Sequence, residues 1–114
     1  MGWAYHDKKE YDKAIVAFQK AIDIDSGYAS SWNGLGCAYN YKGEYKTAIE
    51  YCQRATELDE KYAAPWNNLG YAHDKLGDYE KAIECYKKAI VLDPKDAAPL
   101  SNLGSAYNRP IRKP

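Results

Sequence analysis

Three cysteines and two histidines are the side chains that could build a metal site, a disulfide or a nucleophile. The cysteines are Cys37, Cys52 and Cys85, and the histidines are His6 and His73. A structural zinc site needs four ligands that converge on one point. No CxxC pair occurs here, and an odd set of widely spaced cysteines is typical of reduced thiols that pack as small apolar side chains. We therefore expect no metal site and no cofactor.

The charged side chains are balanced and interleaved along the chain. There are 16 Lys and Arg residues and 16 Asp and Glu residues, so the formal net charge is zero. Carboxylates that act as acid and base need a shared pocket, whereas here they occur in solvated mixtures such as DKKEYDK. Proteins that bind nucleic acid usually present a basic face. We expect no catalytic residues and no nucleic-acid partner.

The length and the amino-terminal residues place the chain in a broad class. A chain of 114 residues with 46% apolar residues predicts one globular domain. No apolar run approaches the roughly 18 residues of a membrane span. The opening residues MGWAYHDKKE resemble neither a signal peptide nor a transit peptide. These features predict a cytoplasmic protein without a membrane partner.

An internal repeat with a period of 34 residues organises the chain. Sliding the sequence by one period places Trp32 on Trp66, and places Gly36 on Gly70 and then on Gly104. The same register aligns a tyrosine set, an alanine set and an aspartate set: Tyr11, Tyr45 and Tyr79; Ala14, Ala48 and Ala82; Asp25, Asp59 and Asp93. Periods of about 20 to 50 residues are typical of stacked units that bury their apolar faces against their neighbours.

Each period contains two amphipathic helical patterns separated by a turn. In the last whole period the first pattern covers residues 63–76 and stops at Gly77, where a left-handed cap is easy to form. The second pattern covers residues 78–92 and ends at Asp93 and Pro94. Two helices joined by so short a turn must pack antiparallel, so each period predicts a helical hairpin.

A glycine lies in the middle of the first helix of each hairpin, although glycine costs a helix about 1 kcal/mol relative to alanine. Small residues such as Gly70 on the first helix and Ala82 on the second let the two helix axes approach closely. We therefore expect the glycines to be contact points between the two helices of a hairpin.

The spacing W-x2-L-G-x2-[YH], followed by G-[ED]-Y-x2-A-I and by A-x5-LD, closely resembles the tetratricopeptide repeat (TPR). In that register the chain contains these segments: a partial repeat over residues 1–28, whole repeats over 29–62 and 63–96, a final first helix over 97–108, and a basic tail over 109–114. The resemblance implies an all-α fold, a solenoid of αα-hairpins wound into a right-handed superhelix. It also implies that the first helices line a concave groove that binds peptides or other proteins.

The residues of the first helices that are not needed for hairpin packing form the expected peptide-binding surface, by resemblance to the family. They are Asn33, Cys37, Asn40, Tyr41, Asn67, Asn68, Tyr71, Asp74, Lys75, Ser101, Asn102, Ser105 and Arg109, with Trp3 and His6 at the amino-terminal mouth. Asparagine offers a donor and an acceptor to a peptide backbone, and tyrosine offers flat apolar contact. We expect an extended, largely uncharged peptide as ligand. The alternative is that asparagine only fills space at these positions.

Members of the family that clamp the acidic carboxyl terminus of heat-shock chaperones use Lys and Arg alongside two asparagines. Asn68 matches one of these asparagines, but Cys37 replaces the other. Asn33, Ala98 and Asn102 stand where the basic residues belong. A carboxylate would find little countercharge in this groove, so we do not expect a chaperone clamp.

A structural role is the second function that the sequence supports. The final helix has no second helix behind it, and its residues Leu103, Ala106 and Tyr107 are expected to present an apolar face to water. The helix around residues 11–24 is expected to be only partly covered. Such a chain is either a piece of a longer array or a module that stacks head to tail with further copies of itself.

Overall fold

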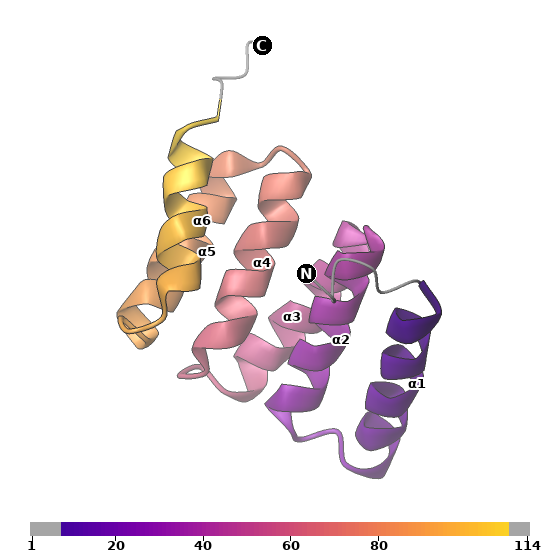
Figure 1. Ribbon diagram of the computed structural model, residues 1–114. Helices are drawn as coiled ribbons and strands as arrows, with labels where there is room; N and C mark the ends of the chain where they lie inside the picture. Colours follow the sequence, from indigo (N-terminus) through magenta and orange to yellow (C-terminus); the bar gives the residue numbers. More distant parts are fainter. Residues whose placement is uncertain (1–7, 110–114) are drawn as a thin grey trace.

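The computed structural model describes residues 8–109, and all regular secondary structure in this range is helical. The helices are α1 (Lys8–Ile24), α2 (Ala29–Lys42), α3 (Tyr45–Leu58), α4 (Ala63–Lys75), α5 (Tyr79–Leu92) and α6 (Ala97–Tyr107). Figure 1 shows α2, α4 and α6 in one layer, with α3 and α5 behind them. The predicted all-α solenoid of helical hairpins is confirmed. No helix between residues 8 and 109 combines the length and apolar character needed to cross a membrane.

Glycine closes the first helix of both whole hairpins. Gly43 has φ of 83° and Gly77 has φ of 87°, in the left-handed region that side chains with a Cβ rarely adopt. The Gly77 N–H donates to the Asp74 carbonyl over 3.0 Å, and the next N–H, that of Asp78, donates to the His73 carbonyl over 2.9 Å. These bonds satisfy carbonyl groups at the helix end and turn the chain back into α5.

Glycine in the middle of α2 and α4 marks the closest approach within each hairpin. A Cβ placed on Gly70 would lie 2.6 Å from Tyr86 Cε1 and 3.1 Å from the Ala82 carbonyl oxygen. A Cβ on Gly36 would overlap the sulfur of Cys52. The expectation that these glycines are contact points between the helices of a hairpin is therefore confirmed. The third glycine of this set, Gly104, has nothing within 4 Å of its Cβ position, because no described helix packs on that side of α6.

The second helices contribute a buried stripe of small and aromatic side chains to the core. Its members are fully buried, with 0% exposure: Ala48, Cys52, Ala55, Ala82, Tyr86 and Ala89. The corresponding residues of α1, which are Ala14, Phe18 and Ala21, are only half-buried. Helix α1 is therefore less covered than α3 and α5, as its position at the edge of the described fold requires.

The apolar surface of α6 differs from the one expected from the sequence. Ala106 is only 3% exposed, and Leu103 packs against the buried pair Ala82 and Tyr86, so neither presents an apolar face to water. Tyr107 is 59% exposed, as expected. Leu100, at the position of the two tryptophans in the repeat, is 50% exposed. The difference arises because the side of α6 that carries Leu103 and Ala106 packs on α5, whereas the side that carries Leu100 is uncovered.

Candidate peptide-binding groove

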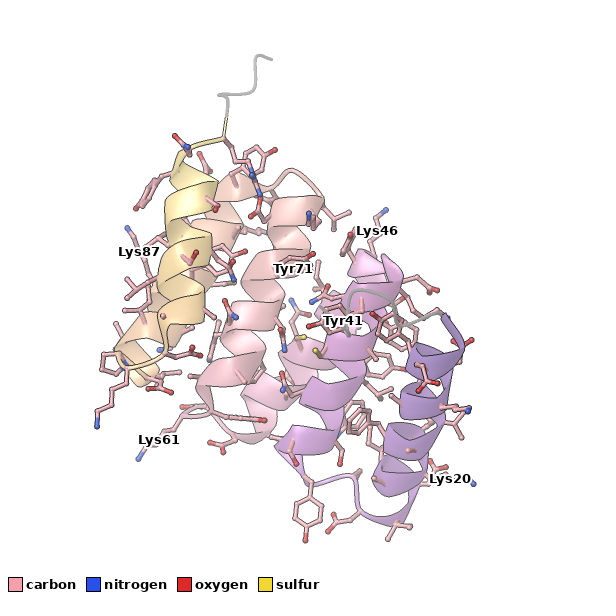
Figure 2. The ribbon with its side chains drawn as sticks, in the orientation of Figure 1. Lys20, Tyr41, Lys46, Lys61, Tyr71 and Lys87 are labelled. Atoms are coloured by element: carbon pink, nitrogen blue, oxygen red, sulfur yellow. The ribbon has the colours of Figure 1, made fainter. Side chains whose placement is uncertain are left out.

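The first helices of the repeats, α2, α4 and α6, form the inner layer, and a hollow between α2 and α4 that reaches Asn102 of α6 is lined by seven of the predicted groove residues. It has a volume of about 370 Å³ and is lined by Cys37, Asn40, Tyr41, Asn67, Asn68, Tyr71 and Asn102. Tyr41 and Tyr71 lie near the same end of α2 and α4, where the two helices face each other (Figure 2). None of the seven side chains carries a charge. A second hollow, of about 330 Å³ between α1 and α2, shares Cys37 and Tyr41 with the first and is also lined by Asn33.

Asparagine side chains pair across neighbouring repeats along this surface. Asn68 Nδ2 donates to Asn33 Oδ1 over 2.8 Å, and Asn102 Nδ2 donates to Asn67 Oδ1 over 3.1 Å. Both pairs join residues one period plus one residue apart, so the same geometry recurs along the solenoid. Each carboxamide has three or four hydrogen-bonding positions and uses only part of them here. The asparagines therefore hold the inner helices together and still present amide groups to the groove.

Asn40 forms the floor of the hollow. Its residue exposure is only 6%, and its Nδ2 donates to the backbone carbonyl of Asn68 over 3.1 Å. Its Oδ1 is buried, and no residue in the described part of the chain donates a hydrogen bond to it. Buried polar atoms in folded proteins almost always have a hydrogen-bond partner, so the unpaired Asn40 Oδ1 is an exception to this rule.

Asp74, in the last turn of α4, and Arg109, which follows α6, bind each other. Arg109 Nε lies 3.0 Å from Asp74 Oδ1, and Arg109 Nη2 lies 3.1 Å from Asp74 Oδ2. Tyr86 donates its hydroxyl to Asp74 Oδ2 over 3.4 Å. Burial, together with the negative charge of Asp74, raises the pKa of Tyr86. Two of the three predicted groove charges, those of Asp74 and Arg109, therefore neutralise each other.

Lys75 turns towards an aromatic ring. Its Nζ lies 5.3 Å from the centroid of the Tyr71 ring, close enough for a cation–π contact.

The sequence interpretation missed the tyrosines of the second helices that pack against Tyr41 and Tyr71 of the groove. Tyr45 packs edge-on against Tyr71 with centroids 6.3 Å apart, and Tyr11 stacks on Tyr41 at 5.4 Å. Their recurrence with the 34-residue period was the available signal.

The remaining predicted chemistry-bearing residues contribute packing. Cys52 and Cys85 are buried and Cys37 is half-buried, and all three thiols are free. Burial raises the pKa of Cys52 to about 12 and that of Cys85 to about 11, and it lowers the pKa of His73. In the described part of the chain, no cluster of three His, Cys, Asp or Glu side chains is arranged to hold a metal ion.

Four further predicted positions either line neither hollow or lie outside the described residues. Ser101 and Ser105 are exposed on α6 and line neither hollow. Trp3 and His6, expected at the amino-terminal mouth, fall outside the described residues.

Residues 29–62 and 63–96 match the family profile described as tetratricopeptide repeat, and residues 2–40 match one described as TPR repeat. The two whole repeats alone cover more than half of the chain. The chain therefore belongs to the tetratricopeptide repeat family, as its sequence pattern predicted. No curated protein sequence matches it.

Solved structures share the fold over nearly the whole chain. The Sgt2 TPR domain from Aspergillus fumigatus is 27% identical, with a TM-score of 0.83 over 93% of this chain and 78% of that one. The second TPR domain of human RPAP3, solved in complex with the HSP70 peptide SGPTIEEVD, is 23% identical, with a TM-score of 0.82 over 89% of this chain and 84% of that one. The protein MamA is 33% identical, with a TM-score of 0.78. The match covers 86% of this chain and 57% of MamA.

Proposed function

We propose that the chain is a protein-interaction scaffold whose concave face binds an extended, largely uncharged peptide. The observation that carries this proposal is the hollow between α2 and α4, because amide and tyrosine side chains line it and no charged side chain does. Amides can pair with the backbone of an extended segment, and the tyrosines provide flat contact at low entropic cost. The lining contains the Cys37 thiol, but burial raises the pKa of that thiol, and no histidine or carboxylate among the described residues lines the hollow beside it. Binding is therefore the function that this lining supports best.

The charges around the groove also favour an uncharged ligand. The RPAP3 domain was solved in complex with a peptide that ends in EEVD, so a domain of this fold can bind a peptide with an acidic end. In the present chain Arg109 is engaged by Asp74, and Lys75 lies over Tyr71. An acidic peptide would lose hydration at this hollow without gaining a bidentate basic partner. We therefore expect selectivity against peptides with acidic ends.

Nuclear magnetic resonance mapping with a selected peptide tests this proposal. The probe is a heptapeptide obtained by selecting a displayed random library on the full chain. The expected result is that amide shifts change along α2 and α4, around Cys37 and Tyr71, and stay constant in α3 and α5. Shift changes confined to α3 and α5 would move the binding surface to the opposite face and contradict the proposal.

The alternative proposal is a structural module that stacks end to end with copies of itself. It is favoured by the open Cβ position of Gly104, where Gly36 and Gly70 meet a second helix. Helix α1 presents the matching feature, since Phe18 is half-buried where Tyr86 is fully buried. A head-to-tail contact of this kind is heterologous and would extend into a filament.

A further inference from the structure

The asparagine pairs that join successive inner helices stop at α2. Asn68 and Asn102 occupy the same repeat position, and each donates to an asparagine of the preceding inner helix. Gly34 occupies that position in α2. A Cβ on Gly34 would overlap the Phe18 ring, so this ring of α1 fills the space that a side chain would need. The surface beside Gly34 is therefore apolar, whereas the equivalent surface of α4 and α6 carries an amide.

The hollow between α1 and α2 is lined mainly by apolar groups. Its volume of about 330 Å³ is at the lower end of the range for ligand pockets, so it suits a single side chain. None of the described residues that line it carries a charge. Phe18 is half-buried here, whereas Cys52 and Tyr86 at the equivalent positions are fully buried. Contiguous apolar surface that stays open in this way is typical of a contact site. The lining includes Tyr11, Ala14, Phe18, Gly34, Cys37 and Tyr41.

The amide and thiol groups of this hollow offer little to a polar ligand. Asn33 Oδ1 accepts from Asn68 Nδ2 over 2.8 Å, and Asn33 Nδ2 donates to the Tyr62 hydroxyl over 3.4 Å. Burial raises the pKa of the Cys37 thiol, so this side chain stays neutral and packs as a small apolar group. A charged or amide side chain would lose its hydration here, whereas an apolar side chain would remove apolar surface from water.

This hollow is continuous with the one between α2 and α4, because Cys37 and Tyr41 line both. The Tyr41 ring stacks on the Tyr11 ring, with centroids 5.4 Å apart. A peptide that crosses α2 beside Cys37 and Tyr41 can therefore place its backbone against the amides on one side and one side chain in the apolar hollow on the other.

We propose that the hollow between α1 and α2 is an anchor pocket for one bulky apolar side chain of the bound peptide, such as leucine, methionine or phenylalanine. The inference rests on the proposed function, since it assumes a peptide in the groove, and it adds which kind of residue anchors that peptide. The anchor side chain covers the Phe18 ring and Ala14, and its backbone passes beside Cys37 and Tyr41.

The first test changes only the peptide, so it does not depend on how a protein variant folds. Heptapeptides selected from a displayed random library on the full chain should share a bulky apolar residue at one position. Replacing that residue by alanine or by asparagine should each weaken binding about tenfold or more, because apolar surface of the hollow would stay uncovered or would meet a polar group. Groove-binding peptides that tolerate both replacements would overturn the anchor pocket and leave the peptide-binding function standing. A library that yields no groove-binding peptide would overturn both.

The second test locates the anchor side chain. Phe18 is the one phenylalanine of the sequence, so 4-fluorophenylalanine incorporated during expression labels this hollow alone. The fluorine resonance should shift when the selected peptide binds. It should stay in place when the alanine-substituted peptide is added at saturating concentration. An unchanged resonance with the selected peptide would place the anchor elsewhere and contradict the assignment.

The same label distinguishes the other possible occupants of the hollow. A shift that follows protein concentration in the absence of peptide would identify a second copy of the chain as the occupant. A nuclear Overhauser contact from the label to residues 1–7 would identify the amino terminus instead. Either result would overturn the anchor pocket.

The third test fills the hollow by substitution. Ala14→Leu adds bulk at a lining residue, and Ala17→Leu makes the same change at an exposed residue of the same helix. Ala14→Leu should weaken the selected peptide about tenfold and leave the affinity of the alanine-substituted peptide unchanged, which a merely structural effect would not do. Ala17→Leu should leave both affinities unchanged. Equal losses for the two peptides in Ala14→Leu would show that the substitution does not compete with the anchor and would overturn the assignment.

Discussion

Arg109 binds Asp74 through two hydrogen bonds, with Nε 3.0 Å from Oδ1 and Nη2 3.1 Å from Oδ2. The Asp74 side chain is only 6% exposed, and the Arg109 side chain is 36% exposed. The pair joins Arg109, two residues beyond the end of α6, to the last turn of α4, and Tyr86 of α5 adds a third contact. A bidentate guanidinium–carboxylate pair fixes orientation as well as charge, so it holds α6 in register with α4.

Arg109→Ala should destabilise the fold by roughly 1–3 kcal/mol, because it leaves the buried Asp74 carboxylate without its counter-ion. The half-exposed position of Arg109 keeps the expected cost below that of a fully buried pair. Glu57→Ala is the matched control, since it removes one partner of an exposed pair in which Arg54 lies 3.4 Å away. That variant should change the free energy of unfolding by less than about 1 kcal/mol. Equal losses in urea denaturation would show that the Asp74 pair is not a structural tie.

Glycine-to-alanine substitutions at equivalent positions should have opposite effects. Gly70→Ala brings a Cβ to 2.6 Å from Tyr86 Cε1 and should destabilise by about 1–3 kcal/mol through overpacking. Gly104→Ala meets nothing within 4 Å and should stabilise by up to about 1 kcal/mol through helix propensity. Thermal unfolding of the two variants decides the matter. If Gly70→Ala melts at or above the parent temperature, the hairpin contact described here is wrong.

The buried thiols should make the fold less stable in alkaline solution. Burial raises the pKa of Cys52 to about 12 and that of Cys85 to about 11, above the ordinary thiol value of 9.0. A thiol with a raised pKa contributes stability that is fully present below its unfolded-state pKa and is lost as pH rises towards the folded-state value. The free energy of unfolding should therefore fall as pH rises from about 9 towards about 12. The double variant Cys52→Ala, Cys85→Ala should show a shallower fall in denaturant titrations, and an identical pH profile would count against burial as the cause.

Self-association through α6 would appear as a mass that rises with concentration. Light scattering over about a hundredfold range should show this rise if α6 of one copy stacks on α1 of the next. Leu100→Glu places a charge on the uncovered side of α6 and should suppress the rise. Val91→Glu, at a residue of α5 that is 77% exposed, is the control and should leave the rise intact. A constant monomer mass in the parent protein would remove the stacking module as a function.

The period of the sequence was sufficient to predict the hairpins and their helix ends. Residues 63–76 were expected as a helix, and α4 covers Ala63–Lys75. Residues 78–92 were expected as its partner, and α5 covers Tyr79–Leu92. These ends are set by local signals, such as the left-handed Gly77 and the Asp93-Pro94 pair, which act within a few residues. Helix ends that depend on such local signals can therefore be predicted directly from the sequence.

The pairing of groove side chains could not be predicted in the same way. Asp74 and Arg109 were expected to face a ligand, yet the structure shows that they bind each other. Asn40 was expected at the surface of the groove, yet it is only 6% exposed and lies at the floor of the hollow. The Asp74–Arg109 contact joins residues one period plus one residue apart, and Asn40 contacts Asn68 of the next repeat. Contacts between repeats of this kind depend on the small rotation between successive repeats. Helical periodicity gives the face on which a residue lies but does not give this rotation.

Calorimetric titration of a library-selected peptide against the parent protein and Asn68→Ala tests the central claim most directly. Asn68 lines the hollow, so its loss should weaken binding by roughly 1–3 kcal/mol, whereas Asn108→Ala on exposed surface should bind as the parent does. The Kd of the parent should change little from about 50 to about 200 mM salt, because the expected ligand is uncharged. An equal Kd for Asn68→Ala and the parent, or a steep loss of affinity with salt, would contradict an uncharged peptide bound in this groove.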